Sequence, residues 1–216
     1  HSDATSGLVA NPVAGGFADL LVDHGGSAVV GETIEWLGAE DIVARRAVTK
    51  QLADAIRSAV LDRERTIAAT GIDLTGNNPG AENIRGGLTT IEEKSLGAVA
   101  KTGSGPIRGL LAHAEAPTSN GLFLMDGQSF SAESVTGFVA AGAQIVLFNK
   151  GDGNSYCSAL APTIKIAARP ETVRRLVDQI DFDASPVFEG REALGAAAAR
   201  LFDLVLAVAS GALTWG

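Results

Sequence analysis

The chain has 216 residues, 46% of them hydrophobic, and 25 acidic against 17 basic side chains give it a formal net charge of −8. This acidic balance excludes a nucleic-acid backbone as the expected partner, because there is no basic excess to displace counterions from phosphates. The single cysteine excludes an internal disulfide, and no apolar stretch is long enough to span a bilayer. We therefore expect a cytoplasmic protein that binds neither nucleic acid nor a membrane.

The first third of the chain is predicted to contain mostly helices. Asn11-Pro12 predicts a helix start, because Asn is a good N-cap and Pro is tolerated in the first turn. Gly25-Gly26 predicts its end. Residues 27–33 are predicted to form a buried strand, and residues 37–48 and 49–70 two further helices.

A long polar segment and a capped helix occupy the middle of the chain. Residues 71–87 are rich in Gly, Asn and Pro and predict a loop, and ordered loops of this length are usually functional. Thr90 and Glu93 predict a capping box at the start of a helix over 91–101. In it, Thr90 would accept a hydrogen bond from the Glu93 amide, and Glu93 would reach back to the Thr90 amide.

Strands and helices alternate through the second half. Strands are predicted over 121–126, 143–149 and 163–167, and helices over 131–141 (with a serine cap), 170–179 and 192–209. This alternation predicts an α/β fold of three α/β/α layers around a mainly parallel sheet, with no internal domain boundary. Ligands bind at the carboxyl ends of strands in such sheets, so the loops after Thr33, Asp126 and Asn149 are the places to look.

Two polar positions in the first part of the chain are candidates for chemistry. The segment 2–7 places hydroxyls and a carboxylate at the mouth of a helix, which suits a substrate carboxylate, although a frayed terminus is the simpler interpretation. Glu32, at the end of a predicted strand, is placed to act as a base or to bind a metal, and the alternative is an acid that faces solvent.

Two later segments are also candidates. Gly86-Gly87 would let the backbone approach a ligand closely, and the Thr89-Thr90 helix start followed by Lys94 would hold an anion. The alternative is an ordinary capped helix with a solvated Glu/Lys face. Residues 149–158 combine glycines, Lys and Asp after a strand, but they lack the glycine spacing of a phosphate-binding motif, and a tight loop is the alternative.

Taken in order, these segments resemble the altronate/galactarate dehydratase family, which also includes the large subunit of sulfolactate sulfo-lyase. The most specific segment is G-G-L-T-T-I-E-E-K-S-L-G at residues 86–97. The resemblance runs essentially from end to end, and the flanking matches include Ser2-Asp3, Ser6-Gly7, Asn11-Pro12, Gly25-Gly26, Glu32-Thr33 and residues 161–165.

The resemblance implies that residues 1–216 are a single carboxy-terminal domain of a larger dehydratase or lyase whose amino-terminal and middle domains are absent here. It implies a hydro-lyase that dehydrates a sugar acid such as altronate or galactarate by metal-assisted β-elimination. The divalent metal, of the iron or manganese class, is expected in the full-length enzyme, and this domain alone need not bind it. The expected partners are a small hydroxy-acid substrate, the remaining domains of the same enzyme and further copies in a homo-oligomer.

The resemblance also assigns expected roles, although it fixes positions better than roles and gives no metal ligands. The expected catalytic residues are Asp3, Glu32 and Lys94. The expected substrate-binding residues are Ser2, Ser6, Asn11, Thr89, Thr90 and Lys150. Elimination needs a base for the proton next to the substrate carboxylate and an acid for the leaving hydroxide.

One departure from the family bears on the substrate. The sugar-acid dehydratases of the family have a Thr-Thr-Gly-Arg-Gly-like loop after the central strand, whereas this chain has N-K-G-D-G-N at 149–154, without the arginine. A sulfolactate sulfo-lyase subunit is therefore an alternative. A non-catalytic dimerisation domain is another, because the last predicted helix is rich in apolar residues, namely Leu201, Phe202, Leu204, Val205 and Leu206.

Overall fold

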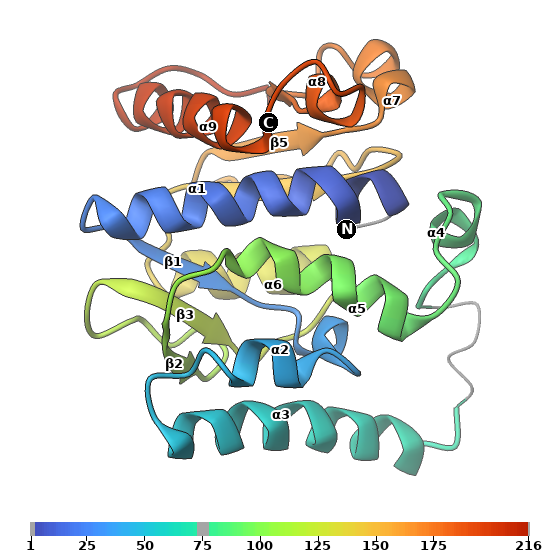
Figure 1. Ribbon diagram of the computed structural model, residues 1–216, viewed down its shortest axis with the longest axis vertical. Helices are drawn as coiled ribbons and strands as arrows, with labels where there is room; N and C mark the ends of the chain where they lie inside the picture. The colour runs from blue at the N-terminus through green and yellow to red at the C-terminus, as the bar shows by residue number, and fades with distance from the viewer. Residues whose placement is uncertain (1–2, 73–77, 216) are drawn as a thin grey trace.

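The computed structural model describes residues 3–72 and 78–215, and its strands form two three-stranded parallel sheets (Figure 1). The first sheet has the order β1-β3-β2 and the second the order β4-β5-β6. The α/β class and the parallel pairing are confirmed, but the strands divide between two sheets. Their bounds are Ser27–Val30 (β1), Ile107–Leu111 (β2), Gly121–Met125 (β3), Val146–Lys150 (β4), Thr163–Ala167 (β5) and Phe182–Asp183 (β6).

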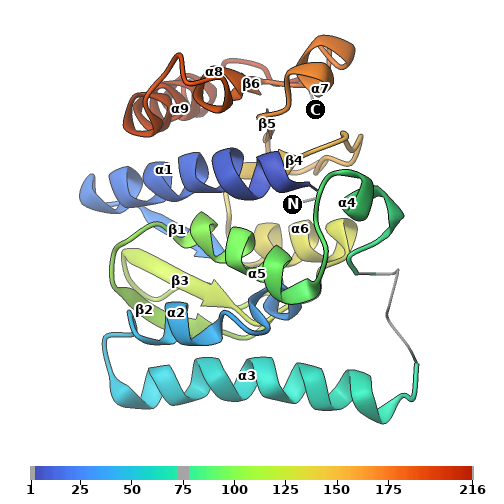
Figure 2. The same ribbon diagram turned by 45° about the vertical axis from the view of Figure 1, so that its right-hand side comes forward.

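Helix α1 (Asn11–Asp23) lies between the two sheets in both views (Figures 1 and 2). It continues directly from a π-helical segment, η1 (Ser6–Ala10). Its apolar face packs against β5 and against α9 (Leu194–Ala209), in a core built on residues such as Val13, Ile164 and Leu201. Burying this face ties the second sheet to the rest of the molecule.

A second core covers one face of the first sheet. It gathers Trp36, Ile56 and Leu124 between the sheet and two helices, α2 (Glu40–Ala44) and α3 (Lys50–Ala69). A smaller cluster on the other face packs Phe123 and Met125 against α6 (Ser131–Ala140). The apolar residues of α9 mostly enter the first core, and of the five noted in the sequence only Leu206 is strongly exposed.

Several predicted boundaries are wrong for identifiable reasons. Asn11 is not an N-cap, because the helix begins before it and its buried side chain bonds elsewhere. Ser131 is the first residue of α6 and does not cap it. The strand predicted over 27–33 ends at Val30, where the backbone turns. The helices predicted over 37–48 and 170–179 shorten to α2 and to α7 (Pro170–Arg175).

The sequence interpretation also missed five short elements. They are β2, β6, the 3-10 turn η2 (Thr33–Trp36), α4 (Ala81–Arg85), which lies inside the predicted 71–87 loop, and α8 (Ser185–Phe188). Gly109 and a register irregularity interrupt β2, which weakens its apolar pattern. The helix predicted over 91–101 divides into α5 (Ile91–Val99) and a 3-10 turn, η3 (Ala100–Thr102). No helix within the described residues is long and apolar enough to cross a membrane.

Candidate functional site

The chain leaves β1 through a strained residue, Glu32, whose φ of 72° and ψ of 63° lie in the left-handed region. This region is costly for a residue with a Cβ and needs support from its surroundings. Thr33 gives that support: its hydroxyl donates to Asp126 at 2.7 Å, and it accepts from the Gly127 amide at 3.0 Å. The ends of β1 and β3 are thereby joined, and Glu32 is held at the carboxyl edge of the first sheet.

Four charged side chains of alternating sign form what we call the charge array: Glu32, Lys101, Glu35 and Lys94. Lys101 Nζ lies 2.8 Å from Glu32 Oε2 and 3.7 Å from Glu35 Oε2, and Lys94 Nζ lies 2.9 Å from Glu35 Oε1. Lys94 also donates to the Asn78 amide oxygen at 2.7 Å. Buried charges need such pairing, because unpaired ones are very costly to take out of water.

The pairing holds two members of the array in their ionised forms. Burial alone would raise the pKa of Glu35, but the surrounding positive charges, those of Lys101 and Lys94 among them, lower it far below its ordinary value. Burial alone would lower the pKa of Lys101, but Glu32 and Glu35 raise it above the ordinary value. Glu35 and Lys101 therefore stay charged at neutral pH.

Lys150, the last residue of β4, lies within the electrostatic field of this array. Burial lowers the pKa of its ammonium, Glu32 and Glu35 oppose that effect, and Lys94 and Lys101 add to it. The ammonium stacks over the Phe148 ring, 4.3 Å from its centroid, and forms no ion pair with any residue that the structure describes. Three lysines therefore face two glutamates, and the excess positive charge suits an anion.

A pair of asparagines joins α1 to the end of β4. Asn11 Nδ2 donates to the Gly97 carbonyl at 2.9 Å, and Asn149 Nδ2 donates to Asn11 Oδ1 at 2.7 Å. Asn149 Oδ1 is buried and has no hydrogen-bond partner within the described part of the chain. Such an acceptor is costly unless something donates to it, so it is a candidate contact for a substrate hydroxyl.

Asp3 caps the first helical turn and is almost fully buried. Its carboxylate accepts from the Ser6 amide at 2.9 Å and from the hydroxyls of Ser6 and Thr5. The frayed interpretation of this segment is therefore wrong from residue 3 onward. Ser2, another expected substrate-binding residue, lies outside the described residues.

The Gly86-Gly87 pair allows a close approach, but the approaching group is the chain itself. The Ala4 amide donates to the Gly86 carbonyl at 3.0 Å, and a Cβ on Gly86 would lie 2.6 Å from Asp3 Cβ. A Cβ on Gly151, after β4, would lie 2.5 Å from Asp3 Cγ. The first turn, the glycine pair and the loop after β4 therefore meet around Asp3.

Thr89 and Thr90 are exposed, and both form hydrogen bonds with Glu93 at the start of α5. Thr90 Oγ1 accepts from the Glu93 amide at 3.2 Å, as predicted. Glu93 reaches back to the amide and hydroxyl of Thr89 rather than to the Thr90 amide, and these bonds lower the pKa of Glu93. In this structure both hydroxyls serve the helix start, which is the simpler of the two interpretations of this segment.

Sequence reasoning missed two residues of this region, Glu35 and Lys101, and it gave Asn149 no role, although the candidate segment 149–158 begins there. A signal was available for Lys101, because it lies seven residues after Lys94 and two helical turns bring both to one face. No comparable signal marked Glu35, since an acid in a polar stretch is usually exposed.

The described residues do not fit a divalent metal by themselves. Within residues 3–72 and 78–215, no three side chains of His, Cys, Asp or Glu gather as a metal-binding group. The two carboxylates of the charge array are paired with lysines, and a dication there would face three ammonium groups.

Comparison with known proteins gives a consistent set of relatives. Residues 1–216 match the family described as D-galactarate/Altronate dehydratase, C-terminal. The chain is 39% identical to (2R)-sulfolactate sulfo-lyase subunit beta of Chromohalobacter salexigens, over 98% of this chain and 55% of that protein. It is 34% identical to altronate dehydratase of Bacillus subtilis, over 87% of this chain and 37% of that protein. It is 32% identical to galactarate dehydratase (L-threo-forming) of Escherichia coli, over 97% of this chain and 40% of that protein. The chain thus spans about half the length of these relatives or less.

Proposed function

Because this chain belongs to the D-galactarate/altronate dehydratase family, as its C-terminal domain, we propose that it is the part of a larger lyase that holds a small hydroxy-carboxylate during elimination of water. The observation that carries this proposal is Lys150: a largely buried ammonium with no carboxylate partner among the described residues, beside the charge array and at the carboxyl end of a strand.

The chemistry of elimination assigns roles to these residues. A base removes the proton from the carbon next to the carboxylate, negative charge spreads onto that carboxylate, and the hydroxide leaves from the next carbon with a proton from a general acid, so that water is released. The resulting enol then becomes a 2-keto acid. Lys150 would bind the carboxylate and stabilise its growing charge, because a desolvated ammonium acts strongly at short range.

Glu32 is the proposed base, since its carboxylate is positioned by the strained turn and by Lys101. Lys94 and Glu35 would fix the charges around it. Asn149 Oδ1 would accept from a substrate hydroxyl. Asp3 enters the proposal as a residue that positions the Gly86 and Gly151 backbones, because its carboxylate is already engaged in the helix cap.

A sugar acid is the first candidate substrate, and water is then the leaving group. Sulfolactate is the second, with sulfite as the leaving group. One observation supports it as the alternative, because the identity to the sulfo-lyase subunit is higher than that to the altronate dehydratase. The resemblance agrees, since Asp152 stands where it implies an arginine-containing loop in the sugar-acid dehydratases. The same proton abstraction serves both, so the site residues keep their roles.

The test is an assay of the full-length protein with galactarate, altronate and sulfolactate, following 2-keto acid and sulfite separately. We expect K150Q and E32Q to lower turnover by about a hundredfold or more, whereas K50Q, at an exposed lysine, leaves it unchanged. Sulfite release would select the second candidate. No product from any of the three, or full activity in K150Q, would refute the proposal.

The remaining partners belong to the same proposal. A divalent metal of the iron or manganese class would be held by other parts of the full-length enzyme, and chelation followed by re-addition of single metals tests this. A homo-oligomer is also proposed, and light scattering on the full-length protein tests it at several concentrations. A strictly monomeric protein at high concentration would contradict the oligomer without affecting the site.

A further inference from the structure

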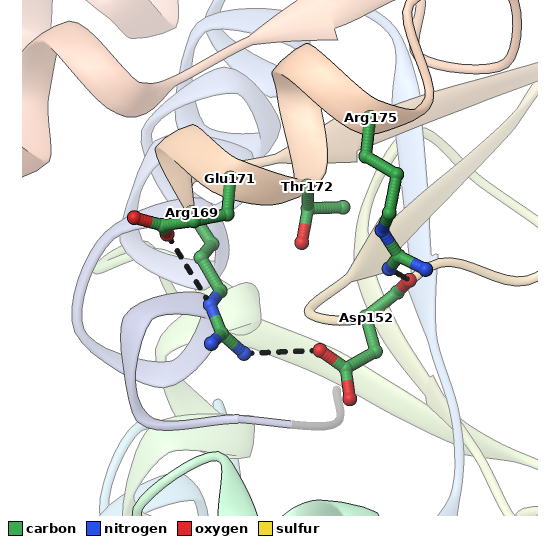
Figure 3. Close-up of a pocket in the computed structure, with 5 residues that line it drawn as sticks. All are labelled: Asp152, Arg169, Glu171, Thr172 and Arg175. Carbon is green, nitrogen blue, oxygen red and sulfur yellow. Dashed lines mark hydrogen bonds and ion pairs between the residues drawn. The ribbon is translucent and has the colours of Figure 1, made fainter.

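A polar pocket of about 290 Å³ opens beside the loop that follows β4 (Figure 3). It lies between this loop and α7, and it is lined by Asp152, Arg169, Glu171, Thr172 and Arg175. None of these residues belongs to the charge array. The pocket is small and polar, which suits a compact charged group rather than an apolar ligand.

The two arginines of this pocket differ in how they are paired. Arg169 lies 3.0 Å from the Asp152 carboxylate and 3.4 Å from that of Glu171. Arg175 donates to the main-chain carbonyl of Asp152 and forms no ion pair with any described residue. A guanidinium has five N–H donors, so most of those on Arg175 remain available. Figure 3 shows the two guanidinium groups on either side of Asp152.

The pocket shares its backbone with the proposed site. The Thr172 hydroxyl donates to the Gly151 carbonyl, and Gly151 packs against Asp3. Asp152 follows Lys150 by two residues, so their Cα atoms are at most roughly 7 Å apart. The pocket therefore begins within two residues of the end of β4, on the same loop.

We propose that this pocket holds a second anionic group of the substrate, a carboxylate or a sulfonate, while Lys150 holds the first. This inference rests on the proposed function. The forked guanidinium of Arg175 matches two oxygens of either group. Asp152 acts as an internal counterion that gives up Arg169 when the anion enters. Of the candidate substrates, galactarate and sulfolactate carry two anionic groups and altronate carries one, so this pocket would favour the first two.

Equilibrium binding to the full-length protein, measured by calorimetry, tests this without relying on turnover. The probes are tartrate and sulfoacetate, which carry two anionic groups, and glycerate, which carries one. We expect at least one of the two dianions, tartrate or sulfoacetate, to bind about tenfold more tightly than glycerate. Tartrate against sulfoacetate then distinguishes a carboxylate from a sulfonate in the pocket.

Variants separate the pocket from its surroundings. R175M should weaken dianion binding about tenfold and leave glycerate unchanged, whereas R174M, at the neighbouring exposed arginine, should change neither. D152N should tighten dianion binding, because Asn no longer competes for Arg169, and a damaged fold would not produce such a gain. Equal affinity for all three probes, equal effects of R175M and R174M, or weaker dianion binding in D152N would overturn the proposal.

The outcome also separates this inference from the proposed function. Binding that prefers dianions and depends on Arg175, in a protein that turns over no hydroxy-acid, would support the pocket and refute the proposed function. Turnover of a dianionic hydroxy-acid that is unaffected in R175M would support the proposed function and refute the role of the pocket.

Discussion

Lys94 Nζ lies 2.9 Å from Glu35 Oε1, and both side chains are less than one tenth exposed. Removing one partner of such a pair leaves the other charge buried without compensation. We expect E35Q to lower the free energy of unfolding by about 3 kcal/mol, and K94M to have an effect of similar size. Urea unfolding followed by the fluorescence of the fully buried Trp36 measures both.

The double variant K94M/E35Q should lose less stability than the sum of the single variants, because the two losses share one interaction. D54N, which breaks the exposed pair of Lys50 and Asp54, is the control and should leave stability nearly unchanged. Strict additivity of K94M and E35Q would contradict the ion pair.

The pKa of Glu35 gives stability a definite pH dependence. It is lowered on folding from an ordinary value of 4.5, so the contribution of Glu35 is fully present above about pH 4.5 and is lost as the pH falls toward the folded pKa. The stability difference between the wild type and E35Q should therefore shrink as the pH falls from 4.5 to 3, because the unfolded chain takes up a proton at Glu35 that the folded protein does not bind. A constant difference over that range would count against this assignment.

The backbone at Glu32 predicts an unusual order of stability. Because φ is 72° there, E32G should be more stable than E32A by about 1 kcal/mol, although both lose the ion pair to Lys101. Gln51, in the exposed part of α3, is the matched control, and there the alanine variant should be the more stable one. The same order at both positions would mean that Glu32 does not keep its left-handed conformation.

Sequence reasoning located much of the site because of a rule about strand ends. The carboxyl ends of parallel strands collect ligand-binding residues, and the order of strands along the chain is enough to assign Glu32 and Lys150 to such ends. The bounds of β5 were predicted correctly, since its short apolar run is delimited by Pro162 and by Arg169-Pro170.

The rest depends on packing that no local pattern encodes. Gly86-Gly87 signalled a close approach of backbone, but only the fold shows that Asp3 and Ala4 are what approach. The division into two sheets likewise follows from α1 packing between them, a long-range arrangement. The burial of Glu35 depends on the positions of Lys94 and Lys101 in space, and a single sequence does not report these.

Lys150 should limit stability while it supports activity. Its pKa is lowered on folding, chiefly by burial, so the unfolded chain binds more protons between the folded pKa and the ordinary value, and the cost is present at neutral pH. We expect K150M to raise the free energy of unfolding at pH 7 by about 1 kcal/mol and to abolish turnover. The gain should disappear as the pH rises past the ordinary value of 10.5. K50M, at an exposed lysine, should change neither the stability nor the turnover. A K150M protein that is less stable than the wild type at pH 7 would contradict the prediction, because it would mean that favourable contacts of the ammonium outweigh the cost of burying it.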